Sequence, residues 1–292
     1  MATRHSEVLY GGYSRYVAWV TRRANTRNAS VQEWQAYLNN RARRLRDNRF
    51  LVHGMRPIAR ALECRWPLET LVYRLGAPEP SEWARHVLES SGVPSVGLVP
   101  EVMAELAEPS EPTPELVAVA VSRRMEIDDF APGTPEQPPT VVVIDRPSSP
   151  ARLGALIRSA AAFGASGVIV TGSGADHYDP QSVRASDGAL FAVPVLRASG
   201  PAQVIAFRDR QRARGIGTRI VGSDDHGGIA LDEFEFGAAT VLVIGDESEM
   251  LAPAWQQVCD ELVCVPTDGS LGSPSAAAVA LYEISRQRRA LR

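Results

Sequence analysis

The chain has 292 residues, of which 45% are hydrophobic and 22% are charged, so it has enough apolar material for two globular domains. No apolar run approaches the roughly 20 residues that a membrane span needs. The N-terminal stretch MATRHSEVLYGGYSRY lacks the apolar core of a secretory signal. This composition excludes membrane, fibrous and mostly disordered classes.

Positive charge is concentrated near the N-terminus. The chain contains no lysine, so all 31 of its Lys and Arg residues are arginine. Residues 1–60 hold 12 arginines against three acidic residues, a balance of +9, whereas the rest of the chain holds 19 arginines against 31 acidic residues, a balance of −12. This asymmetry predicts one face that binds a polyanion.

Residues 1–21 lack clear periodicity, and we expect them to form a flexible arm. Ser30 and Glu33 fit a capping box, which predicts a helix that begins near Val31. Apolar residues then recur at helical spacing and should face a core, namely Val31, Trp34, Leu38, Ala42 and Leu45. The other face carries Arg41, Arg43, Arg44 and Arg46 beside aromatic and amide side chains, a pattern that favours RNA binding over a merely solvated helix face.

Short strands and helices alternate through the rest of the first domain. The sequence predicts strands at 50–52, 68–73 and 116–121, and helices at 55–62 and 81–89. This alternation indicates a small α/β domain over residues 22–125. The stretch APGTPEQPP at 131–139 has the composition of a stiff, solvated linker, so we place the domain boundary within residues 126–139.

Residues 140–292 contain six apolar runs that are separated by helical segments. These runs are 141–144, 167–170, 191–196, 219–221, 241–244 and 262–265. Nearly continuous apolar strands of this kind predict a buried parallel sheet. Ser149, Pro150 and Gly164 are start and stop signals for a helix after the first strand, and a last helix is expected at about 276–291. The buried side of the earlier helix should hold Leu153, Leu156, Ile157 and Ala160.

Four strand ends are rich in glycine and small polar residues, and parallel sheets bind ligands at such ends. They are 145–159, 171–191, 245–251 and 266–275. Ordinary turns would explain any one of them alone. They contain no complete dinucleotide-binding fingerprint, no GxxxxGK[ST] loop and no GxSxG elbow. The three cysteines and five histidines lack metal-ligand spacing, so we expect reduced thiols, a cytoplasmic protein and no metal.

Taken together and in this order, these segments resemble the motifs of the SpoU (TrmH-like) family of SPOUT RNA 2′-O-methyltransferases. The first motif is RPSSPARLGALIRSAAAFGA, the second is VLVIGDESEML, and the third is VPTDGS followed by AAAVALYE. The intermediate stretch YDPQSVRASDGALF is also similar to the family. The segment TRNASVQEWQAYLNNRARRLRDNRFLVHG resembles the ribosomal-protein-like RNA-binding domain that often precedes the catalytic one. The resemblance is strongest to actinomycete ribosomal RNA methyltransferases that confer antibiotic resistance.

The resemblance implies an α/β fold whose C-terminal SPOUT domain, with a parallel sheet, forms a trefoil knot, a rare exception to the rule that protein chains are unknotted. It also implies a homodimer that uses S-adenosylmethionine to methylate a ribose 2′-hydroxyl of RNA, with large-subunit ribosomal RNA as the expected substrate. By similarity, the catalytic candidates are Arg158, Glu247 and Ser270. A guanidinium such as that of Arg158 can hold a phosphate and stabilise negative charge on an attacking oxygen. Glu247 could equally be a structural residue at a helix start.

The resemblance also assigns binding residues. The cofactor candidates are Thr171, Gly172, Gly245, Asp246, Val265, Pro266 and Leu271, mostly through backbone atoms of the loops. The RNA-binding candidates are Arg27, Asn28, Arg41, Arg43, Arg44, Arg46 and Arg184.

The chain departs from the usual family pattern at several loop positions. Arg152 stands where the first motif usually has asparagine, and Asp246 and Met250 replace usual residues of the second motif. The third motif is shorter than usual, so either Ser270 or Ser273 could be its serine. The alternative to an active enzyme is a catalytically degenerate SPOUT homologue that binds RNA or another ligand without methyl transfer.

Overall fold

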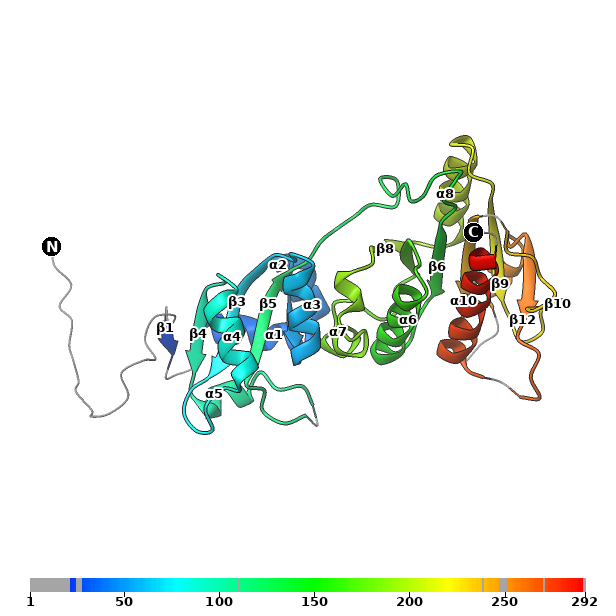
Figure 1. Ribbon diagram of the computed structural model, residues 1–292. Helices are drawn as coiled ribbons and strands as arrows, with labels where there is room; N and C mark the ends of the chain where they lie inside the picture. The colour runs from blue at the N-terminus through cyan, green and yellow to red at the C-terminus, as the bar shows by residue number, and fades with distance from the viewer. Residues whose placement is uncertain are drawn as a thin grey trace, which may run out of the picture.

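The computed structural model describes residues 22–24, 28–109, 111–237, 239–246, 251–269 and 271–290. The predicted flexible arm at 1–21 lies outside these ranges. Two sheets organise the described chain, one of five strands followed by one of seven. Figure 1 shows them as two neighbouring α/β units, joined by a long connection that leads into β6.

The first sheet is mixed, with strand order β1-β4-β3-β5-β2. Its strands are β1 (Arg22–Ala24), β2 (Arg49–His53), β3 (Leu68–Arg74), β4 (Ser95–Leu98) and β5 (Leu116–Val121). Its helices are α1 (Ala29–Asn39), α2 (Arg41–Asp47), α3 (Met55–Glu63), α4 (Glu82–Ser90) and α5 (Pro100–Ala104). The three predicted strands and the helices at 55–62 and 81–89 are confirmed, whereas β1, β4 and α5 were not predicted.

The helix predicted from Val31 through Leu45 is wrong in its second half. The chain forms two helices because Asn28 caps α1 and Asn40 caps α2, each through a side-chain oxygen that accepts a backbone amide hydrogen at 3.0 Å. The second helix therefore has its own axis, and the burial pattern reverses. Arg44 is buried, whereas Ala42 and Leu45 are exposed.

The second sheet is parallel throughout, with strand order β10-β12-β9-β11-β6-β7-β8, which confirms the predicted parallel sheet. Its strands are β6 (Thr140–Asp145), β7 (Gly167–Thr171), β8 (Val195–Ala198), β9 (Thr218–Ser223), β10 (Ile229–Ala230), β11 (Ala239–Ile244) and β12 (Glu261–Cys264). Its helices are α6 (Pro150–Ala162), α7 (Pro180–Ala185), the 3₁₀ turn η1 (Ala189–Phe191), α8 (Pro201–Ala213), α9 (Pro253–Gln256) and α10 (Ser273–Ala290).

The strand predicted at 191–196 begins only at Val195. Pro194 has no amide hydrogen to donate to a neighbouring strand, so the extended ladder cannot run through it. Phe191 instead ends η1 and packs against the first domain, with its ring centroid 5.2 Å from that of Trp66.

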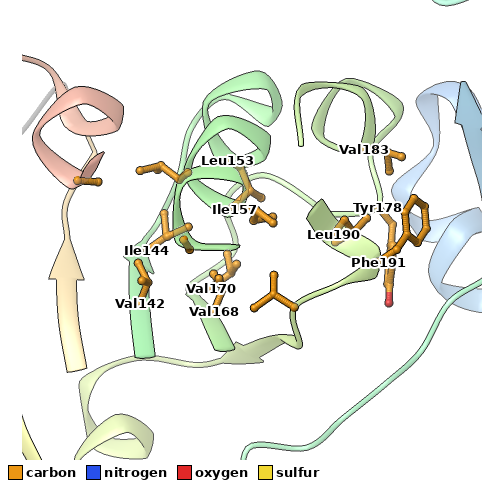
Figure 2. Packing of buried hydrophobic residues seen from close by; sticks show 14 of the residues in the cluster. Val142, Ile144, Leu153, Ile157, Val168, Val170, Tyr178, Val183, Leu190 and Phe191 are labelled. Atoms are coloured by element: carbon orange, nitrogen blue, oxygen red, sulfur yellow. The ribbon is translucent and has the colours of Figure 1, made fainter. Parts of the chain in front are cut away.

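Helix α6 packs on the sheet as the sequence predicts. Ser149 caps it, Pro150 opens it and Gly164 follows with a left-handed φ of 75°. The four residues predicted to be buried, Leu153, Leu156, Ile157 and Ala160, are all buried. Figure 2 shows Leu153 and Ile157 of α6 above Ile144 and Val170 of the sheet. None of the helices in the described ranges is both long and apolar enough to cross a membrane.

Candidate functional site

The carboxyl ends of β6, β7, β9, β11 and β12 lie at one edge of the parallel sheet. Gly245 and Asp246 follow β11 directly. Ser273, the first residue of α10, donates its hydroxyl hydrogen to the Gly245 carbonyl at 2.8 Å. The start of α10 is therefore held beside the end of β11, and this contact brings the second and third predicted motifs together.

Val265 and Pro266 leave the sheet two strands from β11, on the far side of β9. Thr267 closes the turn that follows, because its hydroxyl donates to the Gly269 carbonyl at 2.7 Å. Leu271 is exposed at the end of this segment, just before the helix. The candidates Gly245, Asp246, Val265, Pro266 and Leu271 thus come from loops at a single edge of the sheet.

A buried carboxylate that the sequence did not single out, Asp224, ties these loops together. Its carboxylate accepts the backbone amide hydrogens of His226 at 2.9 Å and of Leu251 at 3.2 Å. Its own amide donates to the Val263 carbonyl at 3.0 Å. The position directly after an apolar strand was the only sequence signal for this residue.

Thr171 and Gly172 lie on the other side of β6, two strands or about 10 Å from Gly245. The Thr171 hydroxyl donates to the buried Asp145 carboxylate at 2.6 Å, and the Gly172 carbonyl accepts from Arg197. These two candidates therefore form a separate polar cluster with Asp145, which sequence reasoning also missed.

Arg152 and Asp246, two of the departures from the family pattern, form an ion pair. Arg152 lies in the first turn of α6 and Asp246 follows β11, and their charged groups are 3.7 Å apart. The unusual cation at position 152 is thus paired with the unusual anion at position 246. The pair connects the first motif to the second across the sheet edge.

Arg158 lies further along α6 on its exposed side, with 58% of its side chain exposed. Its Nη2 is 3.3 Å from Oδ2 of Asp187, and the same oxygen is 3.1 Å from Nη1 of Arg56 in the first domain. The other two catalytic candidates, Glu247 and Ser270, lie outside the described residues, as does Met250. Of the two serines considered for the third motif, Ser273 is the one described, and it contacts Gly245.

Two of the RNA-binding candidates, both on α2, bind the second domain. Arg44 is only 4% exposed, and its guanidinium donates to Asp176 at 2.9 Å and to Asp179 at 3.1 Å in the second domain. Arg41 donates to the carbonyls of Ser173 and Gly174 at 3.0 and 2.9 Å. Both arginines therefore use donors of their guanidinium groups to bind the other domain.

The other RNA-binding candidates are distributed differently. Arg43 and Arg46 remain on the surface of α2, where both pair with Asp47, at 3.2 and 2.8 Å. Arg184 of α7 also pairs across the domain junction, with Glu108 of the first domain at 3.5 Å and with Glu111. Asn28 caps α1. Arg27 lies outside the described residues.

The domain junction also contains a pocket of about 200 Å³ that is open to solvent on one side and is lined by residues of α2, of 122–126, of 176–178 and of β8. Tyr178 closes one side, with its ring stacked on that of Phe50 at 4.4 Å between centroids. Burial lowers the pKa of His177 to about 4, and burial together with Arg41 lowers the pKa of Arg197. His177 is therefore neutral near pH 7.

Comparisons with known proteins identify the class of protein that this fold defines. Residues 28–118 match the SpoU L30e-like domain and residues 139–282 match the SpoU rRNA Methylase family. A 23S rRNA (uridine(2479)-2′-O)-methyltransferase from Streptomyces viridochromogenes is 43% identical over 270 residues, which cover 91% of this chain and 93% of that protein. The chain belongs to the SpoU rRNA methylase family, and the predicted family resemblance is confirmed.

Solved structures agree with this assignment over 90% of the chain. The SpoU methyltransferase AviRb from Streptomyces viridochromogenes, solved in complex with AdoMet, has a TM-score of 0.84 and 42% identity, and the match covers 90% of this chain and 99% of AviRb. An AdoMet-bound rRNA methyltransferase from Sinorhizobium meliloti has a TM-score of 0.75 and 26% identity, covering 90% and 97%. The predicted fold class, a small α/β domain similar to a ribosomal protein followed by a SpoU domain with a parallel sheet, is confirmed.

Proposed function

We propose that this protein is an S-adenosylmethionine-dependent ribose 2′-O-methyltransferase that acts on large-subunit ribosomal RNA. The observation that carries the proposal is the end-to-end similarity to a 23S rRNA uridine 2′-O-methyltransferase, which includes the RNA-binding-type domain as well as the SpoU domain. A ribosomal RNA substrate supports a cytoplasmic location. The resemblance to resistance enzymes further supports a role in antibiotic resistance.

The residues at the sheet edge fit S-adenosylmethionine. The described backbone at Gly245, Val265 and Leu271 offers donors and acceptors, and the exposed Leu271 side chain offers apolar surface for a nucleoside. Gly272 has a left-handed φ of 70°, so the chain can turn tightly into α10. When bound, S-adenosylmethionine supplies an electrophilic methyl group on a positively charged sulfur.

Arg158 is the residue that we propose acts on the RNA. A ribose hydroxyl is a poor nucleophile, and a guanidinium can hold the adjacent phosphate and stabilise negative charge that develops on the attacking oxygen. The exposure of Arg158 supports this role, since an RNA strand can reach it. Glu247 and Ser270 remain catalytic candidates from the resemblance alone.

We also propose that the protein is a homodimer and that its C-terminal segment is knotted. Helix α10 packs against α6, yet its Val279 and Tyr282 are 39% and 49% exposed. Apolar side chains on a helix beside the proposed site suit a second copy of the chain.

The test is methyl transfer from radiolabelled S-adenosylmethionine to unmethylated 23S ribosomal RNA. We expect transfer by the unmodified protein, loss of transfer in Arg158→Ala, and little change in RNA affinity. Arg212→Ala is the matched control, because Arg212 is a partly exposed arginine of α8 that pairs with Asp260 in a different region. An active Arg158→Ala variant would contradict the role of Arg158.

A calorimetric titration with S-adenosylmethionine separates the enzyme from the degenerate homologue. An enzyme should bind the cofactor at micromolar concentration, which corresponds to about −8 kcal/mol. No binding, together with no methyl transfer, would favour a homologue that binds RNA or another ligand without the reaction.

A further inference from the structure

One carboxylate, that of Asp187, lies between two arginines from different domains. Its Oδ2 is 3.1 Å from Nη1 of Arg56, in the first turn of α3, and 3.3 Å from Nη2 of Arg158 on α6. Without the carboxylate, the two guanidinium groups would repel each other at this separation. Asp187 therefore makes their close approach possible.

The backbone, rather than a flexible side chain, sets the position of this carboxylate. Asp187 follows α7 with a left-handed φ of 51°, and Gly188 continues with a φ of 88°. Aspartate and asparagine adopt this conformation more readily than other residues with a side chain. A Cβ on Gly188 would lie 2.6 Å from the Cβ of Arg60, so the turn lies directly against α3.

The two arginines keep most of their surface free for a ligand. The side chain of Arg56 is 75% exposed and that of Arg158 is 58% exposed, whereas Asp187 is only 25% exposed. The formal charge of the three groups is +1. Guanidinium groups bind phosphate oxygens through pairs of N–H donors, and two of them held side by side suit a single RNA phosphate.

We infer that Asp187 is a positioning residue that holds Arg56 and Arg158 as one phosphate clamp across the domain boundary. The clamp fixes the guanidinium of Arg158 relative to the RNA-binding domain, so that RNA held by the first domain meets Arg158 in a set orientation. This inference rests on the proposed function of Arg158.

The variant Asp187→Asn distinguishes the proposed positioning of Arg158 by Asp187 from a simple effect of the Asp187 charge on RNA binding. Asparagine keeps the size and the left-handed backbone, but it removes the negative charge that holds the two guanidinium groups. Because an anion is lost near the RNA, RNA affinity should stay equal or rise. Because Arg158 loses its anchor, kcat at saturating RNA should fall about tenfold. The loss of kcat is therefore expected without a loss of RNA affinity.

Glu63→Gln is the matched control. Glu63 pairs with Arg60 at 2.8 Å on the same helix α3 as Arg56, so the variant removes one negative charge beside an arginine of the same domain. We expect its RNA affinity to respond as in Asp187→Asn, with kcat unchanged. Melting temperature and S-adenosylmethionine affinity are measured for both variants, and we expect neither to change.

Each outcome decides the inference. A tenfold loss of kcat in Asp187→Asn, with intact RNA and cofactor affinity, supports it. An unchanged kcat in Asp187→Asn, when Arg158→Ala is inactive, would overturn this inference but leave the proposed function standing. A loss of kcat that comes with a lower melting temperature or weaker cofactor binding would assign Asp187 a merely structural role. An unmodified protein without methyl transfer would overturn the proposed function and this inference with it.

Discussion

Replacing Arg44 by methionine should weaken the domain junction strongly. Methionine keeps an unbranched apolar stem but removes every donor, including the one to the Tyr37 carbonyl at 2.8 Å. Asp176, which is 6% exposed, and the half-buried Asp179 then lose their counter-ion. A buried ion pair that loses one partner costs about 3–5 kcal/mol, because the remaining charge is left uncompensated. We expect a loss of about 3 kcal/mol, since the Tyr178 amide still donates to Asp176.

Urea unfolding followed by circular dichroism measures this loss, and RNA binding is measured in parallel. Since the lost contacts join two domains, the single transition should separate into two. Arg43→Met is the matched control on the same helix, because Arg43 forms a partly exposed pair with Asp47 and such pairs contribute at most about 1 kcal/mol. A loss below about 1 kcal/mol in Arg44→Met, with weaker RNA binding, would refute the structural role and favour an RNA contact.

Two further outcomes follow from named contacts. Asp246→Asn breaks the partly exposed ion pair with Arg152, which contributes up to about 1 kcal/mol. We therefore expect the affinity for S-adenosylmethionine, measured by calorimetry, to fall about two- to fivefold. An unchanged affinity would show that this ion pair does not contribute to the cofactor site. His177 has a pKa of about 4 in the folded protein against 6.5 in the unfolded chain, so the unfolded state binds more protons between these two pH values. The free energy of unfolding should therefore fall as the pH decreases from 6.5 to 4, by at most about 3 kcal/mol for this residue. In urea unfolding, His177→Gln should lack that part of the decrease across this range. Equal pH slopes for the two proteins would show that the pKa of His177 is the same in the folded and unfolded states, which would contradict the prediction.

Local signals predicted the parts of the fold that depend on local structure. Helix α6 follows from Ser149, Pro150 and Gly164, and its buried face follows from residues at helical spacing, because caps and periodicity act within a few turns. The runs of β-branched residues predicted the parallel sheet for the same reason. Family motifs then predicted the loops at Gly245 and Leu271. They did not predict that Thr171, another cofactor candidate, lies two strands away from Gly245.

The errors arose where the deciding partner is distant in the sequence. Periodicity continued the first helix through Leu45, since it carries no information about a change of helix axis at Asn40. The burial of Arg44 depends on Asp176 and Asp179, more than 130 residues away. Asp187 gave no signal of its own, because its role depends on arginines from two other helices.

The basic N-terminal region and the acidic remainder of the chain are partly complementary to each other. Arg44 binds Asp176 and Asp179, and Arg56 binds Asp187, so acidic groups of the second domain neutralise arginines that composition alone assigned to a polyanion. Within α2 the remaining arginines share Asp47 and face solvent. Exposure therefore separates two groups of arginines. The buried Arg44 orients the first domain relative to the second, whereas Arg46 on α2 and Arg56 on α3 keep 62% and 75% of their side chains exposed, so we expect RNA to reach them.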